Sequence, residues 1–94
     1  MIKQGYKEES SVIQANGTAA TISATAKGSI VILAISSDTA ITVKETNNSG
    51  DVVLNVGSNM YVDSPIRLPL NTAAYIGGTS PTATVWYTYD MNNM

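Results

Sequence analysis

The side chains that most often perform chemistry in proteins are missing from this sequence. It contains no histidine and no cysteine, so the commonest general base, the commonest zinc ligands and the thiolate nucleophile are all absent. Glycoside hydrolysis would still need two carboxylates facing each other across a cleft, and 94 residues leave little depth for one. We therefore expect a protein that is not an enzyme. The carboxylates are Glu8, Glu9, Asp38, Glu45, Asp51, Asp63 and Asp90.

Oxygen-rich loops raise the separate question of calcium. Residues 47–51, Asn-Asn-Ser-Gly-Asp, are rich in oxygen ligands, but they lack the alternating acidic spacing and the terminal Glu of a calcium loop. A turn that needs Asn and Gly for backbone reasons explains them better. Gly77-Gly78 is followed by no lysine and so is no phosphate loop. We expect neither a metal site nor a cofactor.

Aromatic residues are the better guide to binding, because interfaces and sugar sites use Tyr and Trp most often. Trp86 alternates with Tyr87 and Tyr89. If both tyrosines pack inward, Trp86 points out of the sheet toward a partner; the alternative, that Trp86 packs inward or caps the core, stays open. Arg67 could anchor an interface pair, although a solvated charge that protects an edge strand is the favoured role. The candidate partner-binding residues are Trp86, Tyr61, Tyr6 and Arg67.

The composition also favours contact with other proteins. Charged residues make up 13% of the chain, about half of the usual ~25%, and Thr, Ser and Asn take their place. Such a surface costs less to bury, because no full charge is desolvated. A single core of this size gains stability from association. The net charge is −2 and the five cations are dispersed, which disfavours nucleic-acid binding.

No part of the sequence indicates a membrane segment. The longest aliphatic run, residues 30–35, is far short of the ~20 residues of a membrane-spanning helix. The N-terminal residues reach Glu8 and Glu9 before any apolar run, which is unlike a secretory signal peptide. We expect a protein made in the cytoplasm with no membrane contact.

The elements that would position these residues are short strands. Apolar residues recur with a period of two or in short runs, separated by Asn, Gly, Ser, Asp and Pro, which predicts strands and tight turns. We expect an all-β protein, a single antiparallel β-sandwich or jelly roll of about seven to eight short strands in residues 10–90. Residues 1–9 would form an N-terminal arm and residues 91–94 a short tail. The main candidate strands are residues 10–15, 18–26, 29–35, 40–45, 51–56, 66–70 and 82–90.

Several of these segments carry specific expectations. Asn16-Gly17 predicts a two-residue hairpin between the first two strands, because both positions tolerate positive φ. The unbroken aliphatic run at 29–35 predicts a strand buried on both faces, at the centre of the core. A second hairpin at 47–50 would turn Val52, Leu54 and Val56 toward the core. Pro69 places residues 66–70 at a sheet edge.

The order and hydrophobic rhythm of these segments resemble a known family. The resemblance is to small β-sandwich virion proteins of tailed bacteriophages, especially those that decorate or cement the capsid. It covers residues 28–90, includes no diagnostic motif and transfers no functional residue. The segments that carry it are 28–35 (GSIVILAI), 40–43 (AITV), 50–54 (GDVVL), 66–76 (IRLPLNTAAYI) and 83–87 (ATVWY).

This resemblance implies a structural role on the capsid surface of a virion. The chain would be a homo-oligomer, with a trimer favoured, that bridges subunits of the major capsid protein or of another virion component. Residues 1–10 would reach a neighbour, and Trp86 and Tyr61 would be contacts. The alternative is a carbohydrate- or receptor-binding module of a phage fibre or tail, in which Trp86 and the tyrosines stack on sugar rings. A tail or connector subunit is a further structural variant.

Overall fold

The computed structural model describes residues 11–91, and over that range the chain forms nine strands and no helix. No element of this part of the chain is thus a helix of the length and apolar character needed to cross a membrane. The strands are β1 (Ser11–Asn16), β2 (Ala20–Ile22), β3 (Ser29–Ser37), β4 (Ile41–Glu45), β5 (Val52–Val56), β6 (Met60–Val62), β7 (Ile66–Arg67), β8 (Ala74–Gly77) and β9 (Thr82–Asp90).

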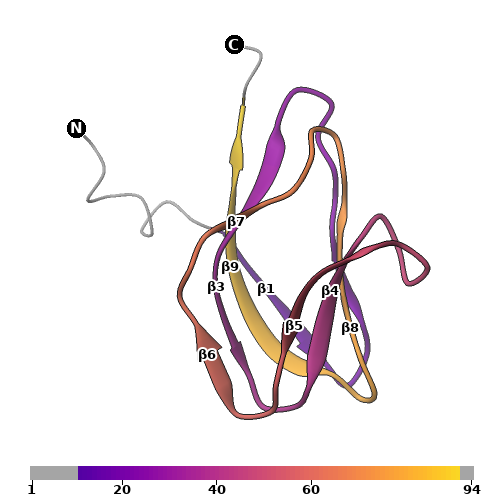
Figure 1. Ribbon diagram of the computed structural model, residues 1–94, viewed down its shortest axis with the longest axis vertical. Coiled ribbons are helices and arrows are strands. Elements are labelled where there is room, and N and C mark those ends of the chain that lie inside the picture. The colour runs from indigo at the N-terminus through magenta and orange to yellow at the C-terminus, as the bar shows by residue number, and fades with distance from the viewer. Residues whose placement is uncertain (1–10, 92–94) are drawn as a thin grey trace.

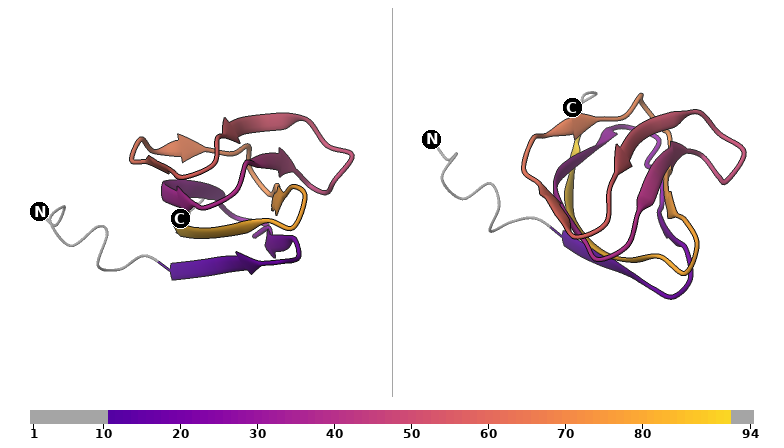
Figure 2. Two further views of the ribbon diagram at one scale, coloured as in Figure 1. Left: turned by 90° about the horizontal axis from the view of Figure 1, so that it is seen from below. Right: turned by 60° about the horizontal axis from the view of Figure 1, so that its bottom comes forward.

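The strands form two antiparallel sheets that pack face to face (Figures 1 and 2). Sheet A has the order β1-β9-β3-β6, with β7 also paired to β3, and sheet B has the order β2-β8-β4-β5. The chain is a long double hairpin, β1–β9, β2–β8, β3–β6 and β4–β5, that is rolled up so that successive pairs alternate between the sheets. This is the jelly-roll arrangement, and it confirms the predicted all-β sandwich.

Strand β3 is the centre of the molecule, as its aliphatic run predicts. It lies inside sheet A between β9 on one side and β6 and β7 on the other, and all of its residues except Ser36 are buried. Its inward side chains Ile30, Ile32 and Ile35 belong to the core between the sheets. Val31 and Ala34 instead share the outer face with their partners Thr88 and Trp86. Both faces of β3 are therefore covered.

The inter-sheet core is built from alternating residues of both sheets. Ile41 and Val43 of β4 point inward from sheet B, and Ala83 and Val85 of β9 point inward from sheet A, all of them buried. This alternation follows directly from the two-residue period of a strand. The hydroxyl of Ser37, buried at the edge of the core, donates to the carbonyl oxygen of Gly57 at 2.8 Å, so its burial leaves no unsatisfied polar group.

The predicted hairpin at Asn16-Gly17 is wrong. Gly17 has a φ of +88°, so a residue tolerant of left-handed backbone is needed there, as predicted. The turn, however, passes from one sheet to the other: β1 pairs with β9, and β2 pairs with β8. The Gly17 amide donates to the carbonyl oxygen of Pro81 at 2.7 Å, so the partner of this turn lies 64 residues along the chain.

The second hairpin is confirmed in position, with one side chain misplaced. β4 pairs with β5 as expected, but the register shifts between Val43 and Lys44. Because of that irregularity Val52 is 51% exposed, whereas Val56 is buried as predicted. The edge position of residues 66–70 is also confirmed, since β7 pairs only with β3, although only Ile66 and Arg67 have strand geometry.

Tyr89 links two parts of the sandwich by a hydrogen bond and makes the stability of the folded state depend on pH. Its hydroxyl donates to the carbonyl oxygen of Ser23 at 2.6 Å, which ties β9 to the segment that follows β2. Burial of the Tyr89 hydroxyl, and secondarily the nearby Tyr87, raises the pKa of Tyr89 above its ordinary value of 10.0. The folded state therefore holds this proton more tightly than the unfolded state.

Above pH ~10 the unfolded chain loses the Tyr89 proton first, so stability falls as pH rises from there through the folded-state pKa. We expect Tyr89→Phe to lower the free energy of unfolding by about 1 kcal/mol at pH 7 and to make the alkaline decline shallower. Urea unfolding between pH 7 and 11 measures both. Tyr61→Phe, at a ring that is 56% exposed, is the control, and an alkaline slope equal in all three proteins would contradict the assignment.

Candidate functional site

The face of sheet A that points away from the core brings the candidate residues together. Three rows of outward side chains cross the strands β1, β9 and β3. The first row is Asn16, Thr82 and Asp38, the second is Gln14, Thr84 and Ser36, and the third is Val12, Trp86 and Ala34. Tyr61 of β6 stands opposite Ser36 and extends the second row. We call this surface, which ends with Arg67 beside Val31, the outer face.

Trp86 and Tyr61 meet on this face as an aromatic pair. Trp86 points outward while Tyr87 and Tyr89 pack against the core, so the open question about its direction is resolved. The ring centroids of Trp86 and Tyr61 lie 6.4 Å apart at an interplanar angle of 73°, an edge-to-face contact. Ala34, the neighbour of Trp86 on β3, is only 2% exposed. Its small side chain leaves room for the two rings, and 56% of Tyr61 remains exposed.

The other two candidate residues have different positions. Arg67 lies on the outer face at the sheet edge and forms an ion pair with Asp90. Both side chains are about half exposed, 46% and 49%, so the pair contributes ~1 kcal/mol or less. Its edge position agrees with the favoured role of a solvated charge on an edge strand. Tyr6 lies outside the described residues.

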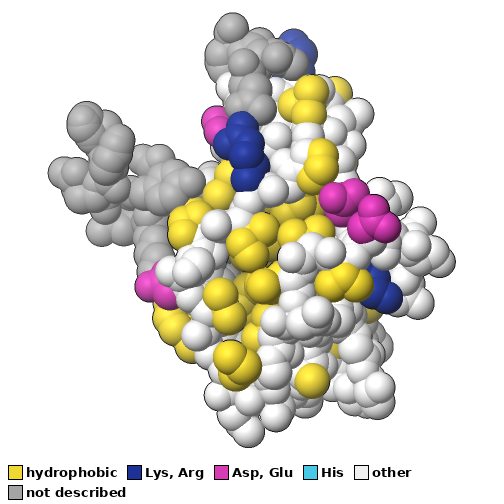
Figure 3. Space-filling model, in the orientation of Figure 1, with side chains coloured by type: hydrophobic (Ala, Val, Ile, Leu, Met, Phe, Trp, Pro, Cys, Tyr) yellow, Lys and Arg dark blue, Asp and Glu magenta, His cyan; other side chains and the backbone are white. Residues whose placement is uncertain are grey.

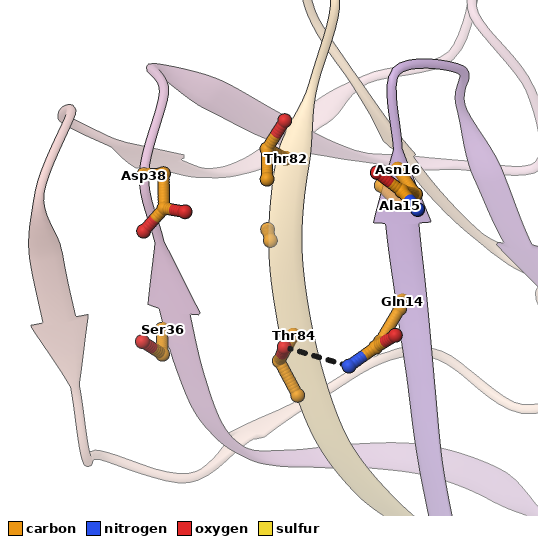
Figure 4. Close-up of a pocket in the computed structure, with 8 residues that line it drawn as sticks. Gln14, Ala15, Asn16, Ser36, Asp38, Thr82 and Thr84 are labelled. Carbon is orange, nitrogen blue, oxygen red and sulfur yellow. Dashed lines mark hydrogen bonds between the residues drawn. The ribbon is translucent and has the colours of Figure 1, made fainter.

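A polar depression of about 250 Å³ occupies the first two rows of the outer face. Its side-chain groups are two amides, three hydroxyls and one carboxylate, and they come from the neighbouring strands β1, β9 and β3 and from Asp38, the residue that follows β3 (Figure 4). Thr82 and Thr84 form its floor on β9, with Ser36 and Asp38 on one side and Gln14 and Asn16 on the other. We call these six residues the polar pocket.

The backbone holds the polar pocket firmly. The Asp38 amide donates to the carbonyl oxygen of Thr82 at 2.9 Å, and the Thr82 amide donates to the hydroxyl of Thr39 at 3.0 Å. Its two walls are separated by two strand spacings, ~10 Å. The amide of Gln14 reaches the hydroxyl of Thr84 at 3.4 Å, a long contact that a better acceptor would replace. The side chains are thus placed for a ligand of small size.

Sequence reasoning does not reveal this pocket. From the sequence, Asp38 is one of several dispersed carboxylates and part of a turn, and the other five residues are the polar positions of alternating strands. Alternation does mark them as outward, so that signal is present. What it leaves open is which strands are neighbours, and the pocket exists only because β9 lies between β1 and β3.

A second surface lies at the side of the sandwich where β5 ends sheet B and β6 and β7 end sheet A. Val53, Leu54 and Val62 pack against the core but stay partly exposed, and Ile66 opposite Ile32 is also half-buried. Seen from this side, apolar side chains gather between β6 and β5 (Figure 3). The exposed Val52 and Leu70, at 51% and 47%, lie on β5 and on the segment between β7 and β8. We call these six residues the open side.

The polar pocket offers a partner hydrogen-bonding groups, and the open side offers it apolar contacts. Within residues 11–91, no group of three or more acidic side chains could hold a metal ion. Both surfaces are poor in charge, and in the polar pocket Asp38 is the single charged group among the described lining residues. Comparison with models of protein families, with curated proteins and with solved structures finds no match to this chain.

Proposed function

We propose that this chain is a structural, non-catalytic virion protein that decorates a phage capsid and stabilises the head by bridging capsid subunits. The observation that carries the proposal is the open side. There, Val53, Leu54 and Val62 pack against the core and yet remain partly exposed, because no strand closes the sandwich between β5 and β6. Burying this apolar surface against another subunit releases water without desolvating a full charge.

The composition supports the same conclusion. Only 13% of the residues are charged, so most of the surface can be covered at low electrostatic cost. A lattice repeats each contact many times, so each copy needs to contribute only a modest affinity. The resemblance of residues 28–90 to decoration proteins points in the same direction. The proposed partner is the major capsid protein, and the proposed free state is a homotrimer.

A pair of matched variants tests the surface. Val52 on the open side and Val12 on the outer face are 51% and 52% exposed, so Asp at either position is compatible with folding. Purified protein is added to capsids of the phage that encodes it, prepared without it, and bound protein is measured by co-sedimentation. We expect Val52→Asp to weaken binding at least about tenfold, because the added carboxylate must lose its hydration when a partner covers the apolar open side.

Val12→Asp should bind these capsids as the unchanged protein does. The proposal fails if the unchanged protein does not bind them at all. It also fails if Val12→Asp is the variant that loses binding, because that result would place the contact on the outer face. Sedimentation equilibrium of the free protein tests the trimer independently.

A further inference from the structure

The outer face carries a second binding surface that the proposed capsid contact does not use. The open side is formed by β5, β6 and β7, whereas the polar pocket is formed by β1, β3 and β9. A protein held by its open side would leave the polar pocket accessible. The chemistry of that pocket, together with the aromatic pair beside it, indicates a particular class of ligand.

The lining of the pocket matches a molecule with many hydroxyl groups. A hydroxyl both donates and accepts, and Gln14 and Asn16 supply amides that also do both. The carboxylate of Asp38 accepts only, and its two oxygens can receive hydrogen bonds from two adjacent hydroxyls. Because Asp38 is the charged group of the lining, it would repel an anion. An anionic ligand is therefore disfavoured, and a neutral molecule rich in hydroxyl groups matches the five uncharged polar side chains around Asp38.

The residues next to the pocket add an apolar contact. Trp86 follows Thr84 by two positions on β9, so its Cα is ~7 Å further along the same face. Tyr61 stands opposite Ser36 of the pocket and contacts Trp86 edge to face. A sugar ring has polar hydroxyls at its rim and an apolar face of C–H groups, and such a face packs against an aromatic ring. Two linked sugar units can use polar groups around one unit and an aromatic ring against the next. The polar pocket and Trp86 lie side by side in that arrangement.

We propose that the polar pocket binds the terminal unit of a neutral hexopyranosyl glycan, and that Trp86 packs against the unit next to it. Asp38 receives hydrogen bonds from two hydroxyls of the terminal sugar. Gln14 and Asn16 bind the opposite rim, and Thr84 exchanges its long contact with Gln14 for one with the ligand. The pocket is shallow, so affinity is modest, with a Kd for a short glycan on the order of 1 mM.

The chain provides its own reporter for this site. Trp86 is its single tryptophan, so any change of intrinsic tryptophan fluorescence arises beside the pocket. The protein is titrated with neutral trisaccharides of glucose, galactose and mannose, and with a sialylated trisaccharide as the anionic probe. We expect saturable binding for at least one neutral series and at least about tenfold weaker binding for the sialylated probe.

Variants assign the binding to the two parts of the site. Asp38→Asn keeps the shape of the side chain but replaces one acceptor oxygen by a donor, and we expect at least about tenfold weaker binding. Trp86→Phe, followed by amide chemical shifts in NMR spectra, should reduce the affinity for the trisaccharide toward that for the monosaccharide. Asp51→Asn, at an exposed carboxylate in the β4–β5 turn, is the matched control and should bind normally.

The proposal is overturned if no neutral sugar produces saturable changes in fluorescence or in the amide shifts of β1, β3 and β9. It is also overturned if Asp38→Asn binds as tightly as the unchanged protein. Val52→Asp separates this site from the capsid contact, because it should weaken capsid binding and leave sugar binding intact. Failure of either proposal can thus be recognised without the other.

Discussion

Replacing Leu68 by Ala is expected to lower the free energy of unfolding by about 2 to 5 kcal/mol, a large part of the stability of a domain this size. Leu68 is 1% exposed and belongs to the inter-sheet core. Its own amide donates to the carbonyl oxygen of Ile30 at 2.8 Å, so the backbone is held in place and cannot move to fill the vacated volume. The loss of stability therefore has two parts, the lost free energy of burying the removed atoms and the cost of the cavity that remains.

Leu70→Ala is the matched control, since it makes the same substitution two residues away. Leu70 is 47% exposed, so we expect a change within about 0.5 kcal/mol. Urea unfolding of both variants, followed by circular dichroism, provides the comparison. Equal losses in the two variants would mean that the alternation of residues 66–70 extends past Pro69 and that Leu70 also belongs to the core.

Gly50→Ala is expected to destabilise the protein by about 3 kcal/mol. A Cβ at Gly50 would lie 1.7 Å from the carbonyl oxygen of Glu45, and both groups belong to the main chain of one tight turn. The turn is fixed by the Gly50 amide, which donates to the Asn47 carbonyl at 2.9 Å, and by the Glu45 amide, which donates to the Asp51 carbonyl at 2.9 Å. Relieving the clash requires breaking at least one of these bonds.

Gly17→Ala distinguishes this clash from the ordinary cost of replacing a glycine. Gly17 has a φ of +88°, but a Cβ added there would have no neighbouring atom within 4 Å. We therefore expect only the conformational penalty, about 1 kcal/mol. Thermal unfolding of both variants measures the difference. A smaller loss in Gly50→Ala than in Gly17→Ala would show that the β4–β5 turn rearranges freely.

Sequence reasoning recovers the parts of the fold that depend on short-range pattern. The aliphatic run of β3 predicts its burial on both faces, and the alternation in β9 places Tyr87 and Tyr89 on the face opposite Trp86, although only the structure shows that the tyrosines are on the inner side. Both results follow from the strand period and from hydrophobicity. The β4–β5 hairpin is also recovered, because its turn and both strands lie within 16 residues.

Two failures of prediction, the Asn16-Gly17 hairpin and the polar pocket, have the same physical cause, which is pairing between distant parts of the chain. Asn16-Gly17 meets the local requirements of a hairpin, yet β1 finds its partner in β9. The predicted direction of Val52 is wrong for a more local reason, because a register shift in β4–β5 breaks the simple alternation. The polar pocket escapes prediction for the first of these reasons, since its walls meet only after the chain has rolled up.

Residue type alone identifies Trp86 and Tyr61 as candidates for binding, but it does not predict that they contact each other. Trp86 and Tyr61 are candidates only because such residues are common at binding sites, and the structure brings them into contact. Nothing in their spacing of 25 residues indicates this, because it requires β3 to lie between β6 and β9. Arg67 is a candidate on the weaker ground of its charge and is paired with Asp90.

The rolled double hairpin also determines the order in which the protein can fold. Closing a long loop costs more entropy than closing a short one, and β4–β5 is the pair with the shortest connection, followed outward by β3–β6, β2–β8 and β1–β9. Folding is therefore expected to start at the middle of the chain and to progress toward both ends. So many distant pairings imply a high contact order and hence a slow folder, on the millisecond to second scale. The last step, docking of β1 onto β9, is also the one that completes the polar pocket.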